Sequence, residues 1–299
     1  MLTTPTFRTI AAGGALAVAA TSGVMLASPA NAAESATLNY ICNSPNLGDF
    51  PVTAKHAIPD TLVYGGKVAV TTTMTLTAET VGGLNFFGFN EVKGGTANNN
   101  GVASVPVGSL PVQFQQNVGQ KDVPAAGPMD LVAIGDVDTA PYAGATPAGT
   151  SVGLAMSDID GADIAAVLTL GKADGWSGDA PVDCELADGQ DLTVGDVTVV
   201  KAGTETTAKL AYKKKAKKMI GKAAVDAPES GVDAAGQVKF TLKRNGKKVG
   251  SKSAELNANE RAKAVFKNIK KKGKYKVVAK YVGGDNFMGS KDGSPVKKV

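Results

Sequence analysis

One short pattern in the chain has the residue types of a serine nucleophile. Gly149-Thr150-Ser151-Val152-Gly153 matches G-x-S-x-G, which is catalytic when it lies between a strand and a helix and a histidine follows it in the chain. The single histidine, His56, precedes Ser151, and no alternation of strands and helices surrounds the pattern. The sequence therefore does not predict a catalytic triad. We expect His56, inside a predicted strand, to be a surface or packing residue.

A second pattern has the residue types of a calcium loop. Asp158, Asp160 and Asp163 lie around Gly161, and calcium favours clustered carboxylate oxygens on such a turn. The EF-hand spacing is absent, because its twelfth position is Thr169 instead of glutamate. We interpret the segment as a solvated acidic loop, with calcium as the alternative. One histidine and two cysteines make a zinc site of the usual kind unexpected, and no pattern predicts a cofactor.

The first 32 residues have the pattern of an export signal. Arg8 precedes an apolar run from Ile10 to Leu26, and Ala30-Asn31-Ala32 is a small-x-small cleavage site. We expect a mature protein that is extracellular, secreted or loosely associated with the cell wall. No transmembrane segment or covalent anchor is expected after cleavage.

The two cysteines suit that oxidising compartment. Cys42 lies near the start of the expected mature chain, and Cys184 lies 142 residues later. Export makes a disulfide between them the default expectation. The alternative is two buried free thiols.

Charge divides the mature chain into two halves of opposite sign. Residues 33–200 carry 19 Asp and Glu against 5 Lys, whereas residues 201–299 carry 26 Lys and Arg against 8 acids. Such asymmetry is a domain-level signal. Combined with a change of pattern near residue 190, it predicts an acidic domain at 33–190 and a basic domain at 191–299.

The acidic half is expected to be all-β. Its β-rich stretches are separated by Gly, Pro and Asn clusters, a spacing typical of a sandwich or barrel of mostly antiparallel strands. One short helix is expected at 78–87, where Val81, Leu84 and Phe87 recur every three residues and Thr77 is placed to cap the start. The expected strands are 37–42, 50–56, 67–77, 103–107, 112–116, 130–134, 151–156, 164–170 and 182–186.

Scattered residues of the acidic half resemble a secreted actinobacterial domain family of unknown function. The resemblance covers about residues 36–190, implies a β-sandwich and implies no activity. It rests on Tyr40-Ile41-Cys42, Leu47-Gly48, Pro51-Val52, Ile58-Pro59, Gly65 and Val182-Asp183-Cys184.

The basic half contains seven expected strands divided by lysine-rich turns, which suit an immunoglobulin-like sandwich. They lie at 193–201, 206–212, 222–226, 236–244, 247–256, 261–266 and 274–281. The half resembles the bacterial Ig-like repeat of secreted and surface proteins, a family without a core disulfide. The resemblance is carried by Gly236-Gln237-Val238-Lys239-Phe240, the hairpin turn Asn245-Gly246, Gly273-Lys274-Tyr275, Ala279-Lys280-Tyr281 and Gly284-Asp285-Asn286-Phe287.

Lysine supplies nearly all of the basic charge, since only Arg244 and Arg261 are arginines in residues 201–299. Lysine is a hydrated point charge, so the surface is interpreted first as a device for solubility and against edge-to-edge pairing. The alternative is binding of an anionic polymer. Specific nucleic-acid binding is not expected, because aromatic residues are few. Binding would use the runs Lys213, Lys214, Lys215, Lys217, Lys218, Lys270, Lys271 and Lys272.

The sequence thus predicts a non-enzymatic, exported protein of two β-sandwich domains, the second immunoglobulin-like. Its predicted role is structural or adhesive, at the cell envelope or in the extracellular space, with other surface proteins as possible partners. The alternative is a module that binds an anionic cell-wall polymer or carbohydrate through the lysine-rich domain. An unrecognised hydrolase is the third hypothesis.

Overall fold

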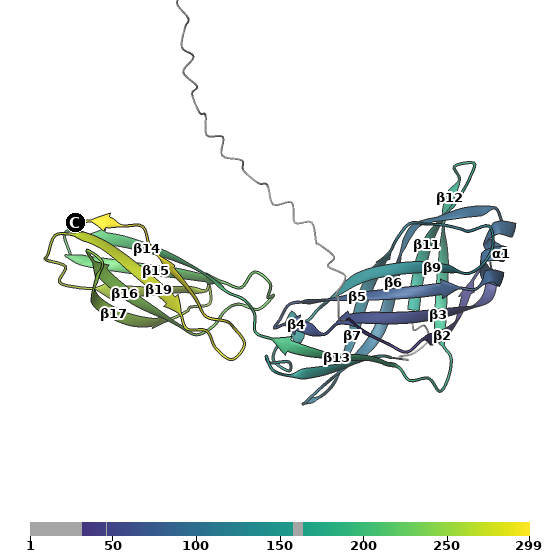
Figure 1. Ribbon diagram of the computed structural model, residues 1–299, viewed down its shortest axis with the longest axis horizontal. Coiled ribbons are helices and arrows are strands. Elements are labelled where there is room, and N and C mark those ends of the chain that lie inside the picture. Colours follow the sequence, from purple (N-terminus) through teal and green to yellow (C-terminus); the bar gives the residue numbers. More distant parts are fainter. Residues whose placement is uncertain (1–31, 46, 158–163) are drawn as a thin grey trace, which may run out of the picture. The chain divides into compact units, whose positions relative to one another are not determined.

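The computed structural model describes residues 32–45, 47–157 and 164–299, and these residues form an all-β fold, as predicted (Figure 1). The first sheet contains thirteen strands. Two helical segments accompany it, α1 (Ala78–Phe86) and the short 3-10 helix η1 (Ala140–Tyr142). Its strands are β1 (Ala32–Glu34), β2 (Leu38–Ser44), β3 (Gly48–Pro59), β4 (Thr61–Val63), β5 (Lys67–Leu76), β6 (Phe89–Val105), β7 (Gly108–Val118), β8 (Lys121–Asp122), β9 (Met129–Asp138), β10 (Ser151–Met156), β11 (Ile164–Lys172), β12 (Ser177–Leu186) and β13 (Thr193–Val200).

This sheet closes on itself. Strand β11 pairs with β12 on one side and with β6 on the other. The result is a ring of eight antiparallel strands in the order β2, β3, β5, β9, β7, β6, β11 and β12, which Figure 1 shows wrapped around a common interior. Beyond Asn100, β6 leaves β11 and pairs with β10, which in turn pairs with β13. The strand spacing of the N-terminal half allowed either two facing sheets or one closed sheet. The structure has the closed sheet.

Alternating side chains fill the ring. Along β2, Leu38, Tyr40 and Cys42 are buried, whereas the residues between them are exposed. The neighbouring strands β3 and β5 alternate in the same way. A period of two places one side of each strand on the core, which is why the sequence pattern predicted these strands well.

Strand β6 is much longer than predicted, because the sequence indicated a strand only at 103–107. The segment from Gly94 to Gly101 is rich in Gly and Asn and has little alternation. It is a strand because it pairs with β7 on one side and β11 on the other. Gly95 is required there, since a Cβ atom would meet the carbonyl oxygen of Val167. Pairing on both sides therefore overrides the low local strand propensity of this segment.

The predicted helix is confirmed as α1. Thr77 is its N-cap, and Thr77 Oγ1 accepts a hydrogen bond from the backbone N–H of Thr80 at 3.2 Å. Val81 and Leu84 are buried, and α1 covers one end of the ring. Within the described chain, neither helical segment has the length and apolarity needed to span a bilayer.

Strand β13 lies in a different sheet from the one that the sequence predicted for it. The sequence placed 193–201 in the C-terminal sandwich, but β13 pairs antiparallel with β10 and parallel with β4 in the first sheet. Its buried side chains Val194, Val197 and Val199 complete the core of that sheet. The first sheet therefore extends past residue 190, and its last strand ends where the charge changes sign.

The C-terminal strands form two sheets that face each other. Gly221 lies at their contact, because a Cβ atom there would be 3.1 Å from the Phe240 ring and 3.2 Å from Val277 Cγ2. The three-stranded sheet contains β14 (Glu205–Lys213), β15 (Lys218–Asp226) and β18 (Arg261–Phe266). The five-stranded sheet contains β16 (Gln237–Arg244), β17 (Lys247–Glu255), β19 (Lys274–Tyr281), β20 (Ser290–Gly293) and β21 (Lys297–Lys298).

Candidate functional site

The two cysteines form a disulfide within the ring. Cys42 and Cys184 lie directly opposite each other on β2 and β12, and their sulfur atoms are bonded. Both side chains are buried. This is the pairing that the cysteine count and the expected compartment predicted. Because β2 is the first strand of the ring in the chain and β12 the last, the bond fastens the closure of the ring.

His56 lies in the ring interior among hydroxyl groups. Its Nε2 atom is 3.2 Å from the Tyr40 hydroxyl, and its Nδ1 atom is 2.9 Å from Thr72 Oγ1. The side chain is fully buried, and burial lowers the pKa of His56 to about 4. The imidazole is therefore neutral at pH 7, with both nitrogen atoms in hydrogen bonds. His56 is a packing residue, one of the two roles expected for it.

Two amide side chains cross the same interior. Asn99 Nδ2 donates to Gln116 Oε1 at 2.9 Å, and Gln116 Nε2 donates to the carbonyl oxygen of Val70 at 2.9 Å. A longer bond of 3.3 Å joins Gln116 Nε2 to the carbonyl oxygen of Ala133. Both amides are buried, and their bonds connect β6, β7, β5 and β9. These polar groups have a structural use, because they join strands inside the ring.

The ring leaves little room for a ligand. Next to the disulfide is a cavity of about 40 Å³, lined by apolar side chains such as Phe50, Leu84 and Leu131. A water molecule needs roughly 10–15 Å³ of such space, and organic ligands occupy pockets of roughly 300–1,000 Å³. This cavity is therefore a packing defect and not a site for an organic ligand.

The structure does not bring the G-x-S-x-G pattern together with a base. Ser151 is exposed at the start of β10, and a strand follows it where the catalytic motif requires a helix. His56 is enclosed in the ring, with Tyr40 and Thr72 as its partners. Ser151 and His56 therefore do not form a nucleophile and base.

The calcium candidates Asp158, Asp160 and Asp163 lie outside the described residues. Among the residues that the structure does describe, no group of three or more His, Cys, Asp or Glu side chains is placed to hold a metal ion. Calcium binding by the acidic loop stays a hypothesis from the sequence.

The structure places both predicted lysine runs at the same end of the C-terminal sandwich. The run of Lys213–Lys218 forms the turn between β14 and β15, and residues 267–273 connect β18 to β19. The backbone N–H of Ile269 donates to the carbonyl oxygen of Lys217 at 2.9 Å, which joins the two segments. The lysine side chains of both runs are exposed, apart from the half-buried Lys218.

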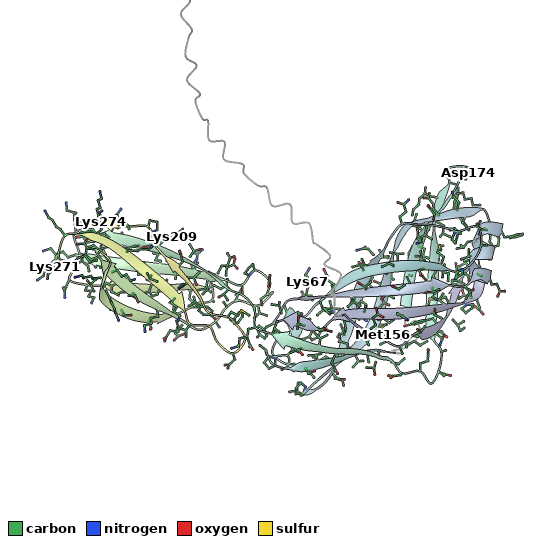
Figure 2. All side chains as sticks on the ribbon, in the orientation of Figure 1. Lys67, Met156, Asp174, Lys209, Lys271 and Lys274 are labelled. Atoms are coloured by element: carbon green, nitrogen blue, oxygen red, sulfur yellow. A yellow bond between two sulfur atoms is a disulfide. The ribbon has the colours of Figure 1, made fainter. Side chains whose placement is uncertain are left out.

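Two further basic segments lie at that end. The turn between β16 and β17 follows Arg244 and precedes Lys247, and the backbone N–H of Asn245 donates to the carbonyl oxygen of Lys274 at 2.8 Å. Strand β21, with Lys297 and Lys298, pairs with the start of β19. Figure 2 shows Lys271 and Lys274 at this end of the sandwich. We call this the basic end, and define it as residues 213–218, 244–248, 267–274 and 297–298.

The acidic residues of the sandwich lie mostly at its other end. Asp292 is the exception, since its Oδ2 atom accepts from the backbone N–H of Ala208 at 2.8 Å in the middle of β14. The others occupy the opposite strand ends and the loops that connect them, at Glu205, Asp226, Glu229, Asp233, Glu255, Glu260 and Asp285. The sandwich is therefore polarised along its strands, with the basic charge concentrated at one end.

Further lysines of the strands were not selected from the sequence, because they do not lie in runs. They form rows across the sheets, in which lysines of neighbouring strands are directly opposite. One row is Lys209, Lys222 and Lys263, and another is Lys239, Lys280 and Lys291. The available signal was a repeated spacing of four residues within predicted strands, which places lysines on one face. It occurs within predicted strands at 239/243 and 276/280, whereas 209/213 and 218/222 each have one member outside the strands predicted at 206–212 and 222–226.

Comparisons with known proteins identify a family for the first sheet. No curated protein matches the chain. A solved structure, the major pilin subunit of Bacillus cereus, is 11% identical over 87% of this chain and 67% of its own, with a TM-score of 0.18 that carries no argument about fold or function. The model of a family of unknown function, DUF6801, matches residues 39–195, within the half where such a family was expected. The likeness of the C-terminal sheets to Ig-like repeats stays a prediction. Since the match to the DUF6801 model spans more than half of the 299 residues of this chain, the chain belongs to the DUF6801 family.

Proposed function

We propose that this chain is an exported, non-enzymatic structural or adhesive protein, and that it attaches to anionic polymers of the cell envelope through the basic end. The observation that carries the proposal is the convergence of four lysine-rich segments on one end of the sandwich. They come from three connections between strands and from the C-terminal strand β21. Lysines that served only solubility would not need to gather at one end of the sandwich.

The charges of the basic end are available to a ligand. Ion pairing does not neutralise them, because within the described chain no carboxylate lies within 4.0 Å of their amino groups. Most of the neighbouring acids lie at the opposite strand ends, so the field of the basic end is largely uncompensated. Such a field concentrates polyanions even where no individual contact is strong.

The first sheet supports a structural role. Its interior is filled by packed side chains, its closure is fastened by a disulfide, and its one histidine is enclosed. Catalytic sites usually combine a concave pocket with titratable groups that face it. The largely apolar ring suits a stable support better than a reaction centre.

The test is co-sedimentation of the mature protein with purified cell wall over a series of salt concentrations. A variant with glutamine at Lys213, Lys214, Lys215, Lys217 and Lys218 should lose most of its retention at low salt. Retention of the unmodified protein should fall steeply with salt, because the Debye length decreases from about 10 Å at 0.1 M to about 3 Å at 1 M.

The chain offers a control with the same change in net charge. The acidic half contains five lysines, Lys55, Lys67, Lys93, Lys121 and Lys172, and glutamine at these positions should leave retention nearly unchanged. Equal losses in both variants would show that only net charge matters. Absence of retention at low salt in every protein would reject the proposal.

A further inference from the structure

The outer face of the three-stranded sheet carries a row of three lysines. Lys209 is paired with Lys222 across β14 and β15, and Lys222 is paired with Lys263 across β15 and β18. All three side chains are exposed on the same face. Neighbouring strands are about 4.8 Å apart, so the row spans about 10 Å. Its central member, Lys222, has a like charge directly opposite on each side.

This arrangement is unfavourable for the fold by itself. Like charges that are directly opposite on neighbouring strands destabilise a sheet. No carboxylate within the described chain lies within 4.0 Å of these amino groups to relieve the repulsion. On one side, the next row along the strands is the apolar set Ala211, Ile220 and Val265. A sheet that only needed solubility would be served better by charges of both signs.

On the other side of the lysine row, the next row along the strands contains an arginine and two small side chains. Thr207, Ala224 and Arg261 are paired across the same three strands. The two rows line a groove of about 530 Å³, to which Asn257 also contributes. The short side chain of Ala224 leaves its centre open. Glu205 and Asp226 lie one row further and do not line the groove.

We propose that this groove binds an anion with several linked phosphate groups. Three lysines and Arg261 place four positive charges within about 12 Å, and a single carboxylate would neutralise only one of them. Linked phosphates supply several negative charges over a comparable length. Arg261 offers a planar fork that pairs with two phosphate oxygens, and lysine binds phosphate as a point charge. No aromatic side chain lines the groove, which disfavours recognition of nucleotide bases.

This groove is a site separate from the basic end, and the inference does not depend on the proposed function. The groove is defined by Thr207, Lys209, Lys222, Asn257, Arg261 and Lys263, none of which belongs to the basic end. Its phosphate groups could come from a free oligophosphate or from a phosphodiester polymer, since both present the same chemistry.

The test is a titration of the mature protein with inorganic tripolyphosphate, in which calorimetry measures the binding affinity. Glutamine at Lys209, Lys222 and Lys263 together should weaken tripolyphosphate binding at least tenfold. The matched control is glutamine at Lys239, Lys280 and Lys291, a row with the same cross-strand pairing on the other sheet. The control should change the affinity less than threefold.

Three additional measurements keep the outcome unambiguous. Without ligand, the groove variant should melt at the same temperature as the unmodified protein or higher, because repulsion in the row is removed. Orthophosphate and polyglutamate should bind at least tenfold more weakly than tripolyphosphate, and a poly(glycerol phosphate) chain that competes with tripolyphosphate would identify a polymer source.

Equal loss in the groove variant and the control, or polyglutamate binding as tight as tripolyphosphate, would overturn the inference. The five-lysine variant of the basic end separates the two proposals. If that variant loses retention on cell wall but still binds tripolyphosphate, both proposals stand. If tripolyphosphate fails to bind any of the proteins, the groove site is rejected, whatever the wall assay shows.

Discussion

At the scale of single residues, His56 shows how burial sets the chemistry of a side chain. An imidazole in water has a pKa near 6.5, whereas the pKa of His56 is lowered to about 4 by desolvation. The hydroxyls of Tyr40 and Thr72 can each donate or accept, so they satisfy the neutral ring in either tautomer. Protonation would place a buried positive charge in the middle of the ring.

The stability of the protein should therefore fall in mildly acidic solution. Below pH 6.5 the unfolded chain takes up a proton at His56 that the folded protein does not, so the free energy of unfolding decreases as the pH falls from 6.5 towards 4. Between pH 7.5 and pH 5 the expected loss is about 2 kcal/mol. Urea denaturation at the two pH values measures it.

A variant with His56 replaced by Gln provides the control for that experiment. It should be less stable at pH 7.5, because the packing of the ring is disturbed, but its stability should depend much less on pH in the same window. An equal pH dependence in the variant and the unmodified protein would contradict the assignment to His56.

At the scale of secondary-structure elements, the disulfide determines how firmly the ring is closed. Cys42 and Cys184 join β2 to β12, and the two strands also pair through hydrogen bonds between their backbones. The bond does not create the pairing. Its contribution comes from the unfolded chain, where it closes a loop of 142 residues.

Removal of the disulfide should leave the fold intact and lower its stability. With alanine at Cys42 and Cys184, the free energy of unfolding should decrease by about 2–5 kcal/mol. Chemical denaturation of both proteins, with and without a reducing agent, measures the difference. The reducing agent should affect only the unmodified protein. Free thiols in the unreduced mature protein, found by mass mapping, would show that the bond does not form.

At the scale of the whole molecule, the strand pairing of β13 moves the boundary between the two halves. Thr193–Val200 belongs to the first sheet, so the sandwich begins with the residues after it. Charge agrees with this boundary, since the excess of basic residues begins at Lys201. Independent folding of the basic half stays a prediction.

We expect residues 201–299 to fold alone, with a cooperative thermal transition that calorimetry or circular dichroism can measure. A longer fragment, residues 191–299, should melt at the same temperature, because β13 has no partner strand within it. Its added strand should instead promote association, as an unpaired edge does. A cooperative transition in the longer fragment alone would place β13 with the sandwich and contradict this boundary.

The sequence by itself determined most of the strands, the helix and the partner of each cysteine. Strands such as β2 and β5 alternate apolar and polar residues, and Thr77 is a suitable cap for α1, so local chemistry was sufficient for them. With only two cysteines and an expected oxidising compartment, one disulfide was the natural outcome. The opposite charges of the two halves are likewise a property of composition.

Only the tertiary structure decided where distant segments meet. The Gly- and Asn-rich part of β6 is a strand because β7 and β11 pair with it, and β11 lies about 70 residues further along the chain. The same holds for the lysines. Composition supplied their number, but strand register placed Lys209, Lys222 and Lys263 in one row, and the turns brought the other lysines to one end. Register and closure depend on long-range pairing, which local sequence patterns do not encode.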